Sequence, residues 1–395
     1  MDRIAPFDAD RCTQCGICLE TCPVLHLSPS EAKVAVKLRA KGKGRAVDQC
    51  TSCFTCNFTC PNQANPAAAM LEIWHERAKE RGFPARAQYF TPDHMPNFRT
   101  YVIDRMPKIQ QQMIRSWADD TPCDEILFPG CNVISAPHLM QTKLVKGMNI
   151  RGSLDLCCGE MYFRTGQKEM VEKTAQRIAA WQEKIGFKKM VIPCTAGMNM
   201  FTNVLPKYGL NRTFEVESLY AVLLRKFKSG ELQVLNPLRM TVTVQDSCHG
   251  KFFGDEYMDI PRKLLGLCGV KIVESRYSRE KMLCCGIGGG FSHQASYHPV
   301  PMSRSTLRTL WEARKTGANA IATYCAGCMQ MLSSGKLMLP TRMGIYHLIE
   351  LLQYAIGERS LHPLRRNTAT MFQGVVRHQL PLVMSRARYF PTRES

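Results

Sequence analysis

Two short stretches of the sequence each contain four cysteines in the same spacing. The pattern C-x2-C-x2-C-x3-C-P occurs as CTQCGICLETCP at residues 12–23 and as CTSCFTCNFTCP at residues 50–61. Three thiolates come from one tight loop, so a four-iron cluster bound there needs a fourth ligand from elsewhere. With two such runs, the cysteine before each proline is expected to serve the other cluster. The predicted [4Fe-4S] cubanes are held by Cys12, Cys15, Cys18 and Cys60, and by Cys50, Cys53, Cys56 and Cys22.

Cysteine usage favours metal ligation over disulfides. The chain has 19 cysteines, an odd number, and its first residues show no basic stretch followed by an apolar segment that would direct export. Without export, the cytosolic thiol pool keeps cysteines reduced. Paired C-x2-C motifs also hold zinc, but the third cysteine and the Cys-Pro ending, both present twice, favour iron-sulfur clusters.

The elements around these motifs are predicted to be helical. Ser28 is a candidate N-cap for a helix that starts at Pro29 and ends by Gly42. Asn65 is placed in the same way before a second helix that ends before Gly82. The sequence therefore predicts an α-helical ferredoxin-type module that ends near residue 120.

Nine of the other eleven cysteines belong to an internal repeat. In each half an apolar run stops at a cysteine, a Leu-Cys-Cys-Gly pair follows, and a helix, a glycine and a second apolar run lead into another cysteine. The set in the first half is Cys131, Cys157, Cys158 and Cys194, and the set in the second half is Cys248, Cys284, Cys285, Cys325 and Cys328. Cys123 and Cys268 belong to neither set and are expected to be packing residues.

The alternation of apolar runs and amphipathic stretches predicts the architecture that carries these cysteines. Strands that alternate with helices form βαβ units, hence mainly parallel sheets with right-handed crossovers. Ligands collect at the carboxyl ends of such strands, where Cys131, Cys194, Cys248 and Cys325 are expected to lie. The predicted fold is multidomain α+β, with the helical ferredoxin module at 1–120, repeated α/β lobes at 121–236 and 237–358, and a basic tail at 359–395.

The repeated cysteine pattern resembles the CCG domain of heterodisulfide reductases. The order of the motifs over residues 1–355 resembles the D-type subunit of those enzymes, which corresponds to their C and B subunits fused. It is also similar to the iron-sulfur subunits of glycolate, lactate and glycerol-3-phosphate dehydrogenases and to a component of class II benzoyl-CoA reductase complexes.

This resemblance implies that the complete set of the second lobe holds a noncubane [4Fe-4S] cluster, the place of disulfide or related two-electron chemistry. Those five cysteines are thus the expected catalytic residues. The first lobe departs from the pattern because Gly197 stands where its fifth cysteine would be. Its four cysteines are expected to hold zinc or a further iron-sulfur cluster, or to be empty.

Several neighbouring residues are candidates for a role at the second-lobe cluster. Gly286, Gly288 and Gly289 do not fit a dinucleotide-binding loop, and they are expected to let backbone N-H groups approach the cluster. His249 and His293 are either proton relays or, more commonly, histidines satisfied in the core or by solvent. A free thioredoxin-like dithiol is the alternative for the C-x2-C motif at residues 325–328.

The formal net charge of +19 indicates acidic partners, although part of it balances anionic clusters. The basic segment after residue 359 shows no clear helix or strand period, so we expect an arm that docks on an acidic partner, or else a solvated tail. Nucleic acid is not an expected partner, because no groove-reading motif or stacking platform accompanies the charge.

The sequence therefore predicts an iron-sulfur oxidoreductase subunit that passes electrons through two cubanes to the second-lobe cluster. The expected partner is a flavoprotein or another redox subunit, or else a membrane cytochrome or an acidic electron carrier. The alternative is a purely electron-transferring subunit with catalysis on another chain. The expected location is the cytoplasm, with any membrane association made through partners.

Overall fold

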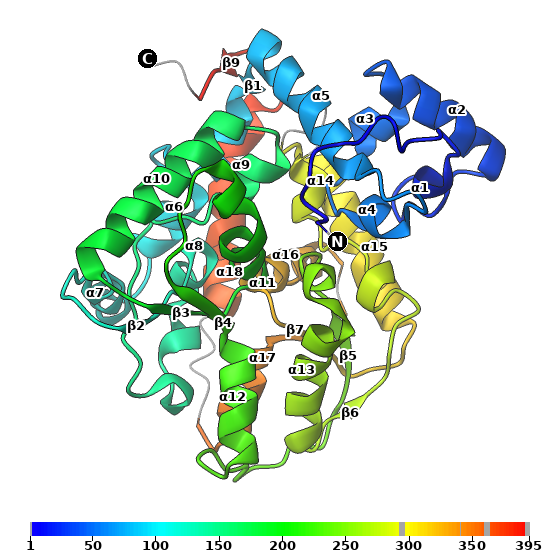
Figure 1. The fold of residues 1–395 in the computed structure, drawn as a ribbon. Helices are drawn as coiled ribbons and strands as arrows, with labels where there is room; N and C mark the ends of the chain where they lie inside the picture. The colour runs from blue at the N-terminus through cyan, green and yellow to red at the C-terminus, as the bar shows by residue number, and fades with distance from the viewer. Residues whose placement is uncertain (1, 292–296, 340, 359–363, 392–395) are drawn as a thin grey trace.

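The computed structural model describes residues 2–391 except for 292–296, 340 and 359–363 (Figure 1). The first part of the chain forms a small group of short helices at the upper right of Figure 1. These helices are α1 (Ile17–Glu20), α2 (Pro29–Ala40), α3 (Arg45–Gln49), α4 (Thr55–Thr59) and the longer α5 (Pro66–Arg81).

Both helices predicted in this module are present, although only one has the expected cap. Ser28 caps α2 in a capping box, with its side chain accepting from the Glu31 N-H and the Glu31 carboxylate accepting from the Ser28 N-H. Asn65 precedes α5 as predicted, but its side chain makes no cap. It has a left-handed backbone and donates to the Asp2 carbonyl oxygen at 3.1 Å, so it ties down the N-terminal segment instead.

A connecting segment joins this module to the first sheet. Its elements are β1 (Phe83–Pro84), the 3-10 helix η1 (Ala85–Phe90), α6 (Phe98–Ile103) and α7 (Lys108–Ser116). The fully buried Trp74 of α5 belongs to the same hydrophobic cluster as Ile126 of the first sheet. The module is therefore packed onto the rest of the chain.

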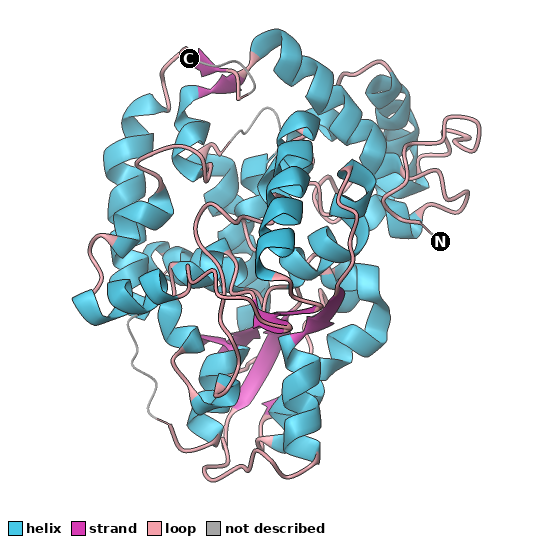
Figure 2. Ribbon diagram, turned by 60° about the vertical axis from the view of Figure 1, so that its left-hand side comes forward, coloured by secondary structure: helices cyan, strands magenta, loops and turns pink. Residues whose placement is uncertain are grey.

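Two parallel sheets follow, as the sequence predicts. The first has the strand order β2-β3-β4, with β2 at Glu125–Leu127, β3 at Lys189–Ile192 and β4 at Glu215–Ser218. The second has the order β6-β5-β7-β8, with β6 at Lys271–Ile272, β5 at Thr241–Gln245, β7 at Ala320–Thr323 and β8 at Gly344–His347. Figure 2 shows these strands gathered in the lower half of the molecule with helices around them.

The helices between the strands repeat in the same order. In the first half they are α8 (Cys131–Ile134), α9 (Glu160–Arg164), α10 (Lys168–Ile185), α11 (Thr195–Asn199) and α12 (Leu219–Lys228). In the second half they are α13 (Gly254–Leu267), α14 (Ile287–Phe291), α15 (Pro299–Arg314), α16 (Ala326–Met338) and α17 (Leu348–Ala355).

The two sheets share one core. A single hydrophobic cluster contains Leu127 and Val191 of the first sheet together with Val242 and Ala322 of the second. The buried Tyr220 hydroxyl donates to carbonyl oxygens that precede a cysteine in each half, at 2.5 Å and 2.9 Å. The two repeats therefore pack directly on each other, and the strand ends that carry cysteines meet.

The segment after residue 363 corrects the expectation that it has no regular structure. It forms α18 (Leu364–Gly374), the π-helix η8 (Val375–Gln379), the 3-10 helix η9 (Leu380–Leu382) and β9 (Arg388–Tyr389), which pairs antiparallel with β1. The long red helix in Figure 1 is α18, and it packs against α6 and α16. The solvated-tail alternative is therefore wrong for residues 364–391, because an apolar side of the segment is covered by the body of the protein.

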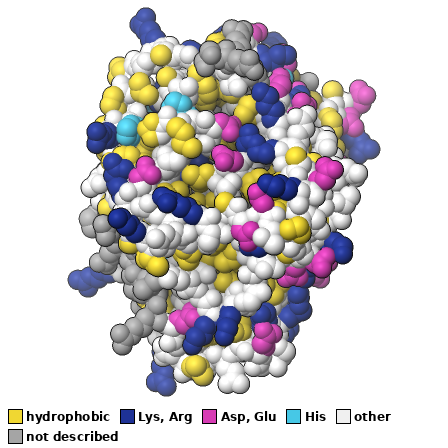
Figure 3. Space-filling model, turned by 90° about the vertical axis from the view of Figure 1, so that its left-hand side faces the viewer, with side chains coloured by type: hydrophobic (Ala, Val, Ile, Leu, Met, Phe, Trp, Pro, Cys, Tyr) yellow, Lys and Arg dark blue, Asp and Glu magenta, His cyan; other side chains and the backbone are white. Residues whose placement is uncertain are grey.

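Cys123 and Cys268 are packing residues, as predicted. Cys268 is 1% exposed in the core that the two sheets share, and Cys123 packs partly buried against the other core. Among the described residues, no helix combines the length and the apolar character that crossing a bilayer requires. Figure 3 shows one face of the molecule, on which basic and acidic side chains are interspersed and apolar side chains line the recesses between them.

Candidate iron-sulfur sites

The two N-terminal cysteine motifs lie side by side and are linked where each one ends. The Thr21 hydroxyl donates to the Thr59 hydroxyl at 2.8 Å, and these threonines directly precede Cys22 and Cys60. Cys18 interacts electrostatically with Cys12 and Cys60, and Cys22 interacts with Cys53. The crosswise exchange of the cysteine before proline is thus compatible with the positions of the sulfurs.

Donors surround these sulfurs. Backbone N-H groups of Ser52 and Ala64 donate to Cys50 Sγ at 3.3 Å and to Cys60 Sγ at 3.4 Å. The buried guanidinium of Arg39 donates to Cys18 Sγ at 3.8 Å and to Cys12 Sγ at 3.9 Å. N-H groups and a buried cation directed at thiolates suit an anionic iron-sulfur centre, so the donor set fits the predicted cubanes.

The CCG cysteines lie where the sequence places them relative to the strands. Cys131 follows β2, Cys194 follows β3, Cys248 follows β5 and Cys325 follows β7, all at carboxyl ends of parallel strands. The vicinal pairs precede α9 and α14. Loops from well-separated parts of the chain therefore bring sulfurs to one edge of each sheet.

The sulfurs of the second set interact in series. Cys284 interacts with Cys285, Cys285 with Cys328, and Cys328 with Cys325. Hydrogen bonds with Cys284 and Cys328 hold the pKa of Cys285 well below its usual value. Cys248 interacts with Cys285 and Cys325, so all five predicted cysteines lie in one neighbourhood.

The first set is continuous with the second. Cys131 and Cys157 have their sulfurs 3.7 Å apart, and Cys157 interacts with Cys158. Cys194 interacts with Cys158 and also, across the repeats, with Cys325. Hydrogen bonds with Cys194 and with Cys328 hold the pKa of Cys325 well below its usual value. Cys194 therefore belongs to the wall of the second site as much as to its own set.

Among the described residues, no group of three or more His, Cys, Asp or Glu side chains is arranged around a position for a single metal ion. A four-iron cluster is larger than one ion and takes its thiolates at separate irons. The donors around the second set fit such a cluster. Gly286 N-H donates to Cys284 Sγ at 3.4 Å, and a further backbone N-H, that of Ile287, lowers the pKa of Cys285.

Gly288 lies at a close approach between modules. A Cβ at this position would come within 2.6 Å of the Arg164 guanidinium, 2.7 Å of the Thr51 carbonyl oxygen and 2.8 Å of Cys284 Sγ. Thr51 follows Cys50 in the second N-terminal motif. The second N-terminal cysteine motif and the second CCG set thus approach each other at a position where only glycine fits.

Arg164 joins the three parts of the chain at this gap. Its guanidinium donates to Cys248 Sγ at 3.4 Å, to Glu160 at 2.8 Å, to Ser52 Oγ at 3.0 Å and to the Thr51 carbonyl at 2.6 Å. Burial disfavours its charge, but Cys248, Glu160 and Cys284 raise the pKa of Arg164 above its usual value. Arg164 therefore remains a cation between the two sites.

Lys251 makes a second link. It follows Cys248 by three residues, is 4% exposed, and donates to the Cys53 carbonyl at 3.2 Å and the Thr55 hydroxyl at 2.7 Å. Burial raises the pKa of the Cys53 thiol, but Lys251 and Thr55 outweigh it and bring that pKa below its usual value. Arg164 and Lys251, which the sequence analysis did not single out, are thus buried cations next to cysteine loops. Only the spacing of Lys251 from Cys248 offered a signal.

His249 is a core residue whose two ring nitrogens both have partners. Nε2 lies 3.1 Å from Glu160 Oε1, and Nδ1 lies 3.1 Å from Asn199 Nδ2. His249 is 1% exposed, which agrees with the commoner of the two expectations. His293 lies outside the described residues.

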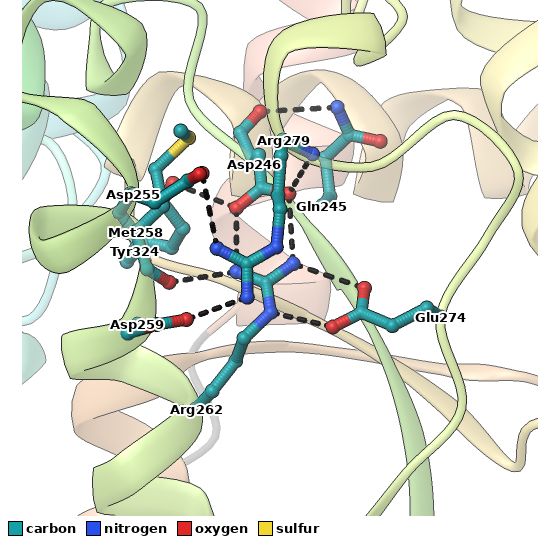
Figure 4. Close-up of polar contacts among 9 residues, drawn as sticks. All are labelled: Gln245, Asp246, Asp255, Met258, Asp259, Arg262, Glu274, Arg279 and Tyr324. Carbon is teal, nitrogen blue, oxygen red and sulfur yellow. Dashed lines mark hydrogen bonds and ion pairs between the residues drawn. The ribbon is translucent and has the colours of Figure 1, made fainter.

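Asp246 fixes the loops that carry the second set (Figure 4). It is fully buried and accepts from Arg262 at 2.9 Å through each carboxylate oxygen, from the Tyr324 hydroxyl at 2.9 Å and from the Arg279 N-H at 2.6 Å. Each of these residues lies shortly before a cysteine of the second set. Asp246 lies two residues before Cys248, Tyr324 one before Cys325 and Arg279 five before Cys284. One carboxylate therefore holds the three loops in register.

Comparisons with known proteins agree with this arrangement. The profile of the 4Fe-4S dicluster domain matches residues 8–64, and that of the cysteine-rich CCG domain matches residues 126–202 and 242–333. The chain is therefore an iron-sulfur protein with a dicluster domain and two CCG segments.

Relatives with assigned names are redox proteins. The D subunit of the dihydromethanophenazine:CoB--CoM heterodisulfide reductase of Methanosarcina barkeri is 28% identical over 59% of this chain and 59% of its own length. The probable iron-sulfur-binding oxidoreductase FadF of Bacillus subtilis is 29% identical over 52% of this chain and 29% of its own. The EtfAB:quinone oxidoreductase of Syntrophomonas wolfei is 24% identical over 83% and 55%. Each match spans less than two thirds of the relative.

Among solved structures, a glutamate racemase from Bacillus anthracis covers 67% of this chain and 85% of its own, at 11% identity and a TM-score of 0.31. A score of this size carries no argument about fold or function.

Proposed function

We propose that the chain reduces a disulfide at the second CCG site, because it carries a 4Fe-4S dicluster domain and two CCG segments and is a homologue of the heterodisulfide reductase D protein. Electrons enter from a partner flavoprotein and pass through two cubanes to a noncubane [4Fe-4S] cluster on Cys248, Cys284, Cys285, Cys325 and Cys328. The observation that carries this proposal is that the second N-terminal motif lies next to the second CCG set. Arg164 donates to both, and Gly288 allows the Thr51 carbonyl and Cys284 to come close together.

The reaction needs two electrons and two protons for each substrate. The disulfide bond breaks, each sulfur takes one electron and one proton, and two thiols leave, with the electrons supplied singly by the partner. The cluster, when bound, supplies an iron that accepts the substrate sulfur and a store for electrons.

Side chains of the protein hold the cysteine loops in place and offset the negative charge of the reduced site. Asp246 holds the cysteine loops, and Arg164 donates to Cys248 and offsets the negative charge that reduction adds. Cys285 and Cys328 are buried and Cys248, Cys284 and Cys325 are half-buried, which limits the access of water to the reduced centre. Cys194 lies in the wall of this site through its contact with Cys325, so the first repeat shapes the pocket whatever its own set binds.

The alternative is that the site only relays electrons to another chain, and the absence of a fifth cysteine at Gly197 favours it. The experiment is to add a thiol to the oxidised, anaerobically purified chain and to record the electron paramagnetic resonance of the second-CCG centre. The proposal predicts a new or shifted signal in the wild type and its loss in Cys328→Ser, whose cubanes keep their ligands. An unchanged wild-type signal would favour the relay.

A further inference from the structure

A cavity of about 170 Å³ opens from the second CCG site and runs along α16. Cys328, Met331, Ser334 and Met338 all line it, and their spacing of three and four residues places them on one face of this helix. Ten residues separate Cys328 from Met338, which is about 15 Å along a helix at 1.5 Å per residue. The cavity therefore has a sulfur end and a distant end.

The distant end is apolar. The apolar residues of the lining that lie outside the cysteine loops are Phe90, Phe98, Met302, Met331, Met338, Met371, Phe372 and Val375. Thioether and aromatic side chains form an adaptable, polarisable wall that binds apolar groups and offers no partner to a charge.

The charged groups that line the cavity already have partners. Glu160 and Arg164 pair with each other at 2.8 Å. Arg99 donates to the Phe90 carbonyl, and Cys131 and Cys157 raise its pKa against the effect of burial. Two neutral amides of the lining are engaged as well, because Gln330 donates to the Asn132 carbonyl and Gln379 donates to the Tyr297 carbonyl. A charged substrate body would therefore be buried without compensation.

Much of this wall lies outside the matched family segments. Phe90 and Phe98 belong to the connecting segment, and Met371, Phe372 and Val375 belong to the C-terminal helices, none of which lies in residues 8–64, 126–202 or 242–333. At Gly374 a Cβ would overlap the Tyr89 hydroxyl and come within 2.8 Å of the Tyr101 ring, so glycine allows α18 to close on the connecting segment. This part of the wall therefore comes from segments outside those that match the dicluster and CCG domains.

The apolar end reaches the surface. Met338 is 40% exposed and Phe372 is 38% exposed, although both line the cavity. A ligand can therefore enter from this end with its reactive group first and leave an apolar tail between α16 and α18. The predicted cluster would fill the part of this cavity at the cysteines, so the apolar part is what remains for the body of the substrate.

We infer that the substrate of this site is an uncharged thiol or disulfide with an apolar body, bound between α16 and the C-terminal helices. This inference rests on the proposed function for the chemistry at the sulfur end. The inference that the site binds an apolar body rests only on the residues that line the cavity.

The experiment measures binding of phenylmethanethiol, which is uncharged at neutral pH, and of the anionic thiol 2-mercaptoethanesulfonate to the anaerobic full chain by equilibrium dialysis. We expect phenylmethanethiol to bind at least tenfold more tightly. Val375→Asp, in the cavity wall, weakens phenylmethanethiol binding tenfold or more, whereas Val376→Asp, 44% exposed and not part of the lining, does not. Met338→Glu weakens binding from the opposite wall and tolerates folding because this position is partly exposed.

Equal affinity for the two thiols, or wild-type affinity in both Val375→Asp and Met338→Glu, would overturn the inference. The electron paramagnetic resonance of the same samples separates this inference from the proposed function. Phenylmethanethiol that binds by dialysis and leaves the second-CCG signal unchanged contradicts the proposed chemistry but supports the apolar site.

Discussion

At the scale of single residues, buried cations next to cysteine loops distinguish the sulfur-rich interior from an ordinary core. Arg39 contacts the first predicted cubane, Lys251 the second, and Arg164 the junction between the second cubane and the CCG site. A buried cation is costly unless an anion is close, and thiolates of reduced clusters are anions. The placement of these side chains therefore indicates where negative charge accumulates when the chain is reduced.

Lys251→Met should lower the reduction potential of the second cubane. Removal of a neighbouring positive charge disfavours the reduced, more negative state, and we expect a fall on the order of 60 mV, the equivalent of a tenfold change for a one-electron couple. Potentiometric titration followed by electron paramagnetic resonance measures this shift. Lys263→Met is the control, because Lys263 is exposed on α13. Equal potentials in the two variants would show that Lys251 does not act on the cluster.

At the scale of elements, the strand ends and their loops are what the sequence could predict. An apolar run that stops at a cysteine, repeated twice in each half, was enough to place Cys131, Cys194, Cys248 and Cys325 at the carboxyl ends of parallel strands. The spacing could not reveal the contact between Cys194 and Cys325, because contacts between repeats depend on how the two sheets pack. Arg164 was hidden for the same reason, since its partners lie on three separate segments.

Asp246→Asn should release the second CCG loops without affecting the N-terminal clusters. Arg262 loses its buried counter-charge and the ties to Tyr324 and Arg279 weaken, because a neutral amide cannot replace a carboxylate that accepts from all three (Figure 4). We expect iron to fall from about twelve to about eight per chain, the loss of one four-iron cluster.

The matched control is Glu274→Gln, which alters the other carboxylate on the same Arg262 guanidinium but is 40% exposed. This variant should keep its iron and its second-CCG spectrum. Retention of all iron in Asp246→Asn would contradict the role given to the buried carboxylate.

At the scale of the whole molecule, the chain joins a helical dicluster module to two CCG segments that share one core. The C-terminal segment was the least predictable part. Its helix α18 packs on α6 and α16, which lie in other parts of the sequence. Gly374 allows α18 to approach Tyr89 and Tyr101 closely, and nothing in the sequence around Gly374 predicts this contact. The basic composition and the lack of a helix or strand period favoured an arm that docks on an acidic partner, or else a solvated tail, whereas the burial of a segment is decided by the partners that tertiary packing supplies.

The central claim is that the later cysteines gather around iron next to the N-terminal clusters. Its most direct test is the iron content of the anaerobically purified chain beside that of a Cys284→Ser/Cys328→Ser variant, with Cys123→Ser as the control that removes a packing cysteine. Three four-iron clusters give about twelve irons in the wild type and the control, and about eight in the double variant. A wild-type content near eight that the double substitution leaves unchanged would contradict the account.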